Sequence, residues 1–208
     1  ANENDPTLRL ENTIISNHSS YGILAYSSKI EASNCQINDN GFHDIFLFAG
    51  GDYRFSHCTF ANYSPMHQSP SLRMSNYYED VNGNEQLRPM ERADFENCII
   101  YGKIESEIGI EESENTTFNY KFNNCLIKLK ESDYDISNTT HFSNNIFNEN
   151  PEFIQTIDFY EYNYELDTLS AAQNSAALNI ANQFPEDLNG NSRISDNNPD
   201  IGAYERIE

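Results

Sequence analysis

Two short segments carry carboxylate and amide oxygens in an order that resembles the start of a calcium loop. Asp187, Asn189 and Asn191 alternate with other residues in one of them, and residues 80–84 repeat the pattern. Calcium takes oxygen ligands from alternate positions of such loops, with glycine at the sixth position. Here glycine stands fourth in both segments. Two alternatives remain, a calcium site and a pair of Asn-Gly turns; the turns are favoured, and no other cofactor is expected.

A second group of candidates lies in residues 77–80, where Tyr77 and Tyr78 precede Glu79 and Asp80. Flat aromatic faces beside hydrogen-bond acceptors suit a neutral polar ligand such as a sugar. Three other tyrosines alternate near the C-terminus, as one face of a strand would: Tyr160, Tyr162 and Tyr164. Sugar binding and ordinary strand faces therefore both remain open, and residues 77–80 are the candidate ligand-binding residues.

The four cysteines could form disulfides or bind a metal. They are Cys35, Cys58, Cys98 and Cys125, and all occupy the same position of a repeated unit described below. Stacked repeats would place them in one inward column, where a free thiol behaves as a small apolar side chain. Such a column rarely offers disulfide geometry. We expect four reduced thiols in the core.

Carboxylates are the groups that glycoside hydrolysis requires, in pairs at a set separation. Asp39, Asp44 and Asp52 are the candidates, and His43 directly precedes Asp44. In a chain with 33 acidic residues, a solvated surface and turn chemistry explain them more simply. The histidines show no metal-ligand spacing. We assign no catalytic residue.

The charge of the chain excludes some partners. With 33 acidic against 12 basic residues, the net charge is −21. Nucleic acids are recognised through basic patches, so a nucleic-acid partner is not expected. The same repulsion disfavours polyanionic sugars. No run of 18 apolar residues occurs, and we expect no membrane span.

An eight-residue unit occurs six times and must position all of these residues. It reads apolar, charged, apolar, polar, Asn, small, variable, apolar, and its copies begin at Leu8, Ile30, Tyr53, Ala93, Tyr120 and Thr140. Successive copies are 20 to 27 residues apart, except for one step of 40. Such a period with occasional insertions is typical of a solenoid. The alternation within the unit predicts a half-buried strand.

Two columns of the repeat predict how the copies stack. The fifth position should form a sharp corner, because Asn tolerates the left-handed backbone region; it holds Asn12, Asn34, His57, Asn97, Asn124 and Asn144. The outward second position alternates in sign over Arg9, Glu31, Arg54, Asp94 and Lys121. Opposite charges stabilise neighbouring strands. We therefore expect parallel strands in register.

We expect a single domain over residues 1–208, with coils over 8–150, an insertion over 64–89 and a C-terminal cap over 151–208. In the insertion, Asn82-Gly83 predicts a hairpin with a two-residue turn. In the cap, residues 170–173 (Ser-Ala-Ala-Gln) read as a capping box that opens a short helix to about Ala181, and Arg193 should pair with Asp200 or Glu205. The polar residues 2–6 either fold over the first coil, or the chain is the C-terminal part of a longer solenoid.

The repeat resembles that of right-handed parallel β-helix proteins, the pectate-lyase-like superfamily, which use inward Asn ladders at a corner. Residues 187–193 (Asp-Leu-Asn-Gly-Asn-Ser-Arg) and 199–205 (Pro-Asp-Ile-Gly-Ala-Tyr-Glu) resemble the ending of the choice-of-anchor Q group. Residues 150–153 and 166–170 also fit, whereas residues 170–173 depart from the usual Ser-Pro-Ala. The resemblance implies an exported lipoprotein of the type common in Bacteroidetes, anchored by a lipid upstream. It implies no activity.

Together these features predict an all-β protein, a right-handed parallel β-helix of about six coils with one hairpin insertion and a C-terminal cap containing a short helix. The expected function is non-catalytic, namely binding of a neutral polysaccharide or a cell-surface protein by a module at the outer-membrane surface, in the periplasm or outside the cell. The alternative is a carbohydrate-active enzyme, a polysaccharide lyase or glycosidase, or a fragment of one. Paired carboxylates in a groove would favour the enzyme.

Overall fold

The computed structural model describes residues 6–158 and 161–207. Nearly all of its regular structure is strand, and both large sheets are parallel, so the all-β prediction is confirmed. Residues 2–5 and Tyr160, for which the sequence made predictions, lie outside the described residues. Within the described residues no helix has the length and apolar character needed to cross a membrane.

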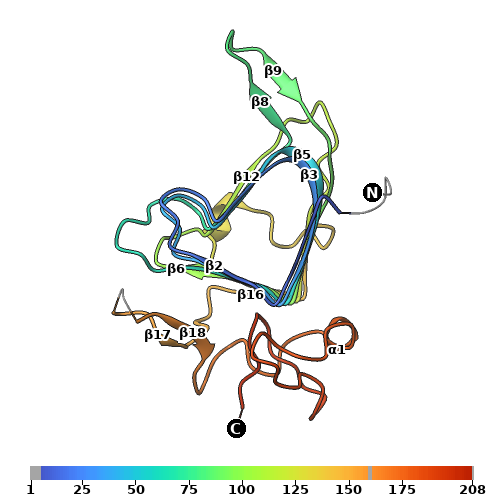
Figure 1. Ribbon diagram of the computed structural model, residues 1–208. Helices are drawn as coiled ribbons and strands as arrows, with labels where there is room; N and C mark the ends of the chain where they lie inside the picture. The colour runs from blue at the N-terminus through green and yellow to red at the C-terminus, as the bar shows by residue number, and fades with distance from the viewer. Residues whose placement is uncertain (1–5, 159–160, 208) are drawn as a thin grey trace.

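Most strands of the two large sheets come from successive copies of the repeat. The eight-stranded sheet contains β1 (Leu8–Glu11), β3 (Ile23–Ser33), β5 (Ile45–Ser56), β7 (Leu72–Ser75), β10 (Met90–Glu96), β12 (Ile108–Glu111), β13 (Lys121–Asn123) and β15 (Phe142–Ser143). The six-stranded sheet contains β2 (Ile14–Ser16), β4 (Gln36–Asn38), β6 (Thr59–Asn62), β11 (Ile99–Gly102), β14 (Leu126–Ile127) and β16 (Ile146–Phe147). Successive turns of the chain overlie one another in a roughly triangular outline (Figure 1).

The corner between the two sheets is made by the fifth position of the repeat, as predicted. All six residues there have a φ between 49° and 54°: Asn12, Asn34, His57, Asn97, Asn124 and Asn144. This is the left-handed region, which Asn enters more readily than most residues. The outward charges also pair in the predicted register, Arg9 beside Glu31 and Asp94 beside Lys121.

An inward column of phenylalanines forms the centre of the core. Phe55, Phe95, Phe122 and Phe142 stack with centroid separations of 5.2, 4.9 and 5.5 Å. The first three are fully buried. Beside them the four cysteines are free and buried, and the Cys98 amide donates to the Cys125 sulfur at 3.4 Å. Reduced core thiols were expected, and the structure contains them.

The long strands β3 and β5 each bend once, at Ser27 and Ala49, where φ is 43° and 57°. Before the bends, β3 pairs with β5, and β5 pairs on with a second set of strands, β5 with β7 and β7 with β12. Leu72 and Met74 of β7 are fully buried. The insertion that protrudes from the sheets is therefore shorter than the segment 64–89 expected from the sequence, since β7 belongs to the eight-stranded sheet.

The hairpin itself consists of β8 (Tyr77–Glu79) and β9 (Glu85–Leu87), and it projects from the stack (Figure 1). The Asp80 amide bonds to the Asn84 carbonyl at 2.9 Å and the Gly83 amide to the Asp80 carbonyl at 2.9 Å. Three residues therefore form the loop, with Gly83 at a φ of 78°. The two-residue turn predicted from Asn82-Gly83 is wrong, because the glycine follows the turn instead of occupying its centre.

The C-terminal cap lies against the six-stranded sheet (Figure 1). It holds β17 (Phe153–Gln155), β18 (Asn163–Leu166) and the helix α1 (Leu178–Ala181); a 3-10 turn, η1 (Glu131–Asp133), precedes it in the chain. A short helix was predicted, but not its start. Asn174 has a φ of 55° and its amide donates to Asp200 at 2.7 Å. The left-handed conformation of Asn174 prevents a continuous helix from Ser170 onward. The residues after Ser170 therefore form only a turn, and the helix begins at Leu178.

Arg193 fastens the cap to the stack. Its guanidinium is fully buried and donates to the Asn34 side chain at 3.2 Å and the Gly202 carbonyl at 3.0 Å. It also pairs with Glu205 at 3.4 Å, as one of the two predicted partners. The other, Asp200, accepts through its backbone carbonyl. The corner residue Asn34 therefore connects the repeat to the C-terminal segment.

Candidate functional site

On the outer face of the eight-stranded sheet, the parts of β3 and β5 before the bends carry aromatic side chains. Ile23 and Ala25 of β3 point inward and are buried. Residues between them and after them point outward, because side chains alternate along a strand. The register places Leu24 beside Phe46 and Tyr26 beside Phe48. Stacking thus brings outward apolar residues of neighbouring turns side by side.

We call the resulting surface the aromatic strip; it consists of Tyr21, Tyr26, Phe42, Phe46, Phe48 and Tyr78. Neighbouring ring centroids along it lie 5.1 to 6.1 Å apart. These separations are those of favourable edge and offset ring contacts. The strip is therefore a continuous surface of rings held in fixed positions by one another and by the sheet beneath.

The strip remains partly open to solvent. Tyr26 is 47% exposed and Phe42 is 54% exposed. Two guanidinium groups lie over its rings, Arg73 at 5.0 Å from the Phe46 centroid and Arg88 at 5.5 Å from the Tyr78 centroid. The surface thus combines apolar faces with N–H donors at its edge. An exposed, contiguous apolar patch of this kind commonly marks an interaction site.

The structure separates the four candidate residues of the hairpin. Tyr78 belongs to the aromatic strip, whereas its neighbour Tyr77 points to the other face of β8. Glu79 is exposed. The Asp80 carboxylate accepts the amides of Asn82 and Asn84 at 2.9 and 3.0 Å, and these bonds lower its pKa. Asp80 therefore serves the turn, and Tyr78 alone lies on the strip.

Of the candidate calcium ligands, Asp187 has both carboxylate oxygens occupied by hydrogen bonds. One Asp187 carboxylate oxygen accepts the amides of Asn189 and Asn191 at 2.8 and 2.7 Å. The other accepts the Glu205 amide and the Asn191 side chain at 2.8 and 3.1 Å. N–H donors surround the carboxylate, as in a hydrogen-bonded turn. Within the described residues no group of three or more His, Cys, Asp or Glu is arranged to hold a metal; calcium binding stays a hypothesis.

The three candidate catalytic aspartates lie in different environments. Asp44 is fully buried and accepts from the Asn40 side chain at 2.9 Å; burial raises its pKa well above the usual value. Asp52 pairs with Lys29 and Arg92 at 3.7 and 2.7 Å. Asp39 borders a hollow that is described below. Asp39 lies near enough to Asp44 for its charge to raise the Asp44 pKa further. Asp44 has no exposed surface, so it does not face a substrate beside Asp39.

The histidines near these aspartates have structural partners. His43 Nδ1 donates to the Pro70 carbonyl at 2.5 Å, so it is not the partner of Asp44. A second buried group was not predicted from the sequence: Glu107 accepts from His67 Nε2 at 3.1 Å and from the Ser71 hydroxyl at 2.8 Å. The Ser71 hydroxyl donates its hydrogen bond to the Glu107 carboxylate and not to the His67 ring. A nucleophile activated by a histidine is therefore not formed.

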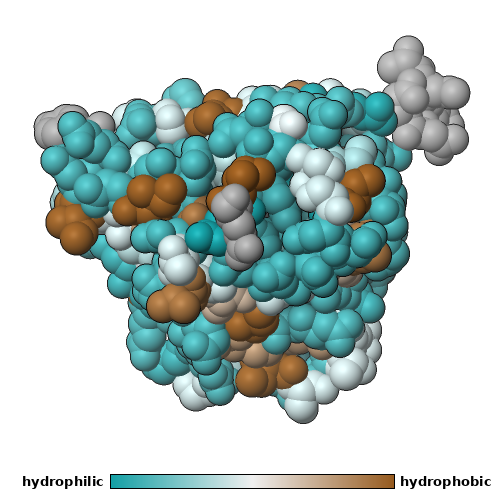
Figure 2. Space-filling model, turned by 90° about the horizontal axis from the view of Figure 1, so that it is seen from below, coloured by the Kyte–Doolittle hydropathy of each residue, from teal (hydrophilic) through white to brown (hydrophobic). Residues whose placement is uncertain are grey.

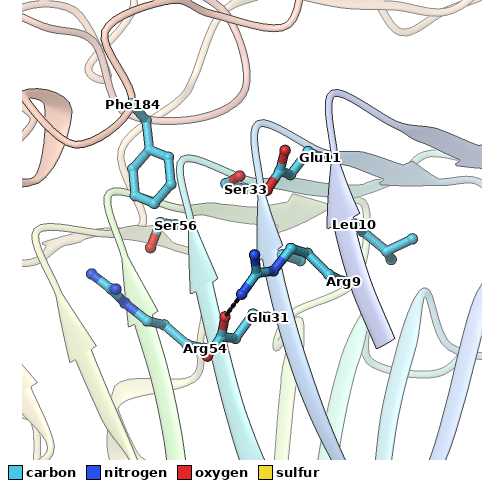
Figure 3. Close-up of a pocket in the computed structure, with 9 residues that line it drawn as sticks. Arg9, Leu10, Glu11, Glu31, Ser33, Arg54, Ser56 and Phe184 are labelled. Carbon is cyan, nitrogen blue, oxygen red and sulfur yellow. Dashed lines mark hydrogen bonds and ion pairs between the residues drawn. The ribbon is translucent and has the colours of Figure 1, made fainter. Parts of the chain in front are cut away.

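A groove of about 220 Å³ lies between the outer face of β1, β3 and β5 and the cap (Figure 3). Phe184 of the cap hangs over the charged side chains of the strands (Figure 3). Arg9 donates to Glu31 at 3.0 Å, and Arg54 donates to Glu96 at 2.8 Å. The predicted alternation of charge is thus real, but Arg54 selects Glu96 in place of Asp94. These charges satisfy one another and support the sheet from outside.

Seen from the cap side, the surface is mostly hydrophilic, and its apolar side chains form small separate groups (Figure 2). The aromatic strip is therefore the better candidate for a binding surface. Sequence reasoning missed most of it. The signal was present in the outward residues Leu24, Tyr26, Phe46 and Phe48, which repeat at an offset of 22 residues on strands whose inward positions are already apolar.

No protein-family model matches this chain, and neither a curated protein nor a solved structure matches it.

Proposed function

We propose that the chain is a right-handed parallel β-helix module of an exported protein and that it binds neutral glycans without acting on them chemically. The solenoid is supported by the pairing of strands one repeat apart in both large sheets. Connections between parallel strands are right-handed in nearly all proteins. The likeness of the C-terminus to the choice-of-anchor Q group supports an outer-membrane surface, periplasmic or extracellular location, with a lipid anchor upstream.

The aromatic strip is the observation that carries the glycan proposal. A sugar ring presents an apolar face of C–H groups and a rim of hydroxyls. Tyr26 and Phe42 offer exposed rings for the C–H face. Arg73 and Arg88 lie beside the rings; one N–H of Arg73 bonds to Glu111 and one of Arg88 to the Leu87 carbonyl, and their other N–H groups can donate to hydroxyls. The rings are held by mutual contacts, so little side-chain entropy is lost on binding. A net charge of −21 favours a neutral glycan over a polyanionic one.

The two other candidates have weaker support. An enzyme of the lyase or glycosidase class needs carboxylates or a base facing the substrate, whereas Asp44 is fully buried and Asp52 is paired with Arg92. A cell-surface protein could also cover the strip, as aromatic residues are enriched at protein interfaces. The ring-and-donor arrangement fits a sugar more directly, and we retain the glycan.

The test is a glycan array combined with a degradation assay on the same preparation. Binding of a neutral glycan without release of products is expected. Tyr26→Ala and Tyr78→Ala should each weaken binding about tenfold, or about 1.4 kcal/mol. The matched control is Tyr77→Ala, since Tyr77 lies on the same hairpin but outside the strip. Unchanged binding in both strip variants would refute the strip as the site, and product release would favour the enzyme.

A further inference from the structure

A hollow of about 840 Å³ adjoins the aromatic strip. Three loops surround it, residues 17–19, 39–42 and 64–68, which connect the six-stranded sheet to the start of β3, β5 and β7. Phe42 belongs both to the lining of the hollow and to the strip. A ligand lying on the rings can therefore extend directly from the aromatic strip into the hollow.

The walls of the hollow are held in place before any ligand binds. The Gly41 amide donates to the His18 carbonyl at 2.8 Å, and the Phe42 amide to the Ser20 carbonyl at 2.7 Å. The first two loops lie so close that a Cβ on Gly41 would be 2.3 Å from the Ser19 carbonyl oxygen. A preformed site of this kind loses less entropy on binding.

The third loop and the inner wall are also held by hydrogen bonds. In the third loop the His67 amide donates to the Ser64 carbonyl at 3.0 Å. At the inner wall the Asp39 carboxylate accepts the Tyr164 hydroxyl at 2.7 Å and the Asn38 side chain at 2.7 Å. Tyr164 belongs to β18 of the cap, so the cap helps to fix this wall.

The chemistry of the lining suits a neutral sugar. Its polar groups include the side-chain amides of Asn17 and Gln68 and the hydroxyl of Ser19, which can both donate and accept hydrogen bonds. Its apolar groups are the Phe42 ring and the Met66 side chain, which is 80% exposed. No Lys or Arg is among the lining residues, whose ionisable members are His18 and Asp39, so the hollow offers an anionic group little counter-charge. The volume is within the range of small-molecule sites.

We propose that this hollow binds the end of a neutral oligosaccharide whose following units lie on the aromatic strip. The inference rests on the proposed function and adds to it a class of ligand, a short neutral chain recognised at its terminus. Phe42 marks the passage from one part of the site to the other. The protein then binds the ends of such oligosaccharides in preference to the interior of a sugar chain.

The experiment compares neutral gluco-, xylo- and manno-oligosaccharides of increasing length with the corresponding polymers at equal mass of sugar, by titration calorimetry. The polymers contain far fewer ends. We expect the wild type to bind the best oligosaccharide at least about tenfold more tightly, per sugar unit, than its polymer. The variant Met66→Ala/Gln68→Ala should lose most of this preference and keep its polymer binding. Both side chains are exposed, so the fold should be unaffected.

The matched control is Ile157→Ala/Gln183→Ala, which removes one exposed apolar and one exposed amide side chain from the cap region. It should behave as the wild type. If Met66→Ala/Gln68→Ala keeps the preference for ends while Tyr26→Ala loses binding, the hollow is not used and the proposed function stands. If the wild type binds neither oligosaccharides nor polymers of these classes, both proposals fail. Equal binding of oligosaccharide and polymer by the wild type overturns the end-recognition proposal alone.

Discussion

The stacked phenylalanines contribute much of the packing energy of this narrow core. Phe95 is fully buried between Phe55 and Phe122, at centroid separations of 5.2 and 4.9 Å. Phe95→Ala removes a ring from the middle of the column and leaves a cavity. We expect a loss of about 3–5 kcal/mol in the free energy of unfolding, measured by urea titration. Val81→Ala, at a fully exposed position, should change it by less than about 0.5 kcal/mol. A small cost at Phe95 would contradict the stacked register.

His57 is the exception in the corner column, and its burial predicts a pH effect. Nε2 accepts from the Asn97 side chain at 2.9 Å, and within the described residues Nδ1 has no partner. Burial, together with the charge of Arg193, lowers the pKa of His57 well below its ordinary value. Unfolding releases the histidine to a pKa near 6.5. Its contribution to stability is therefore complete above about pH 6.5 and is lost as the pH falls below that value.

The variant His57→Asn restores the usual corner residue and removes the titrating group. On going from about pH 7.5 to pH 5, its melting temperature should change in the stabilising direction relative to that of the wild type. A slope from other groups persists in both proteins: burial lowers the pKa of His43, and it raises the pKa of Asp44 and Glu205, which act in the opposite direction. The difference between the two proteins therefore reports His57. The control His18→Asn changes an exposed histidine and should leave the slope of the wild type. An equal slope in His57→Asn and wild type would mean that His57 does not titrate across unfolding.

The four thiols should be unreactive in the native protein. Burial raises the pKa of Cys58 and Cys98 well above the usual value, and the thiolate is the reactive form. We expect no alkylation without denaturant, full alkylation at four sites with it, and the same melting temperature with and without reductant. Mass spectrometry of the unreduced protein checks this directly, since any disulfide would appear as a mass below that of four free thiols.

At the level of elements, sequence reasoning succeeded at positions where the backbone conformation or one neighbouring residue restricts the residue type. The corner asparagines and the alternating charges are such cases, because a left-handed φ and an in-register neighbour each act on single positions. The strands β7 and β12 were missed. Leu72–Ser75 and Ile108–Glu111 lie outside the repeated eight-residue unit. Each strand has only four residues, too few for a periodic pattern to reveal it.

The candidate site was harder to predict than the fold, because it is made by stacking. Tyr26, Phe48 and Tyr78 come from three turns of the chain and meet only in the folded sheet. The sequence pointed to Tyr78 because of its neighbours in the hairpin, but Asp80 serves the turn, Glu79 is exposed and Tyr77 lies on the other face of β8. The start of the cap helix was missed for a similar reason, since Asn174 is held by Asp200, 26 residues away.

The hairpin should be separable from the stack, whereas β7 should not. The Arg88 amide donates to the Asn76 carbonyl at 2.8 Å, so the two ends of the hairpin are adjacent. Replacing residues 77–87 by a short Gly-Asn link should leave the melting temperature within a few degrees of the wild type. It removes Tyr78 and should weaken glycan binding. Replacing residues 66–88 removes Leu72 and Met74 from the core and should unfold the protein. Equal stability of the two deletions would show that β7 is dispensable.

The charge of the whole molecule separates the two kinds of partner. A net charge of −21 creates a field that attracts basic proteins and is screened by salt. A neutral glycan feels no such field, and ring contacts do not depend on ionic strength. We expect the Kd for a neutral oligosaccharide to change less than about twofold between about 50 and 500 mM NaCl. Melting temperatures should rise over the same range, as salt weakens the repulsion among carboxylates, and this rise is the internal control that screening took place. A Kd that weakens tenfold or more over this range would show that charge drives binding, and a basic surface protein would then replace the glycan as the partner of the aromatic strip.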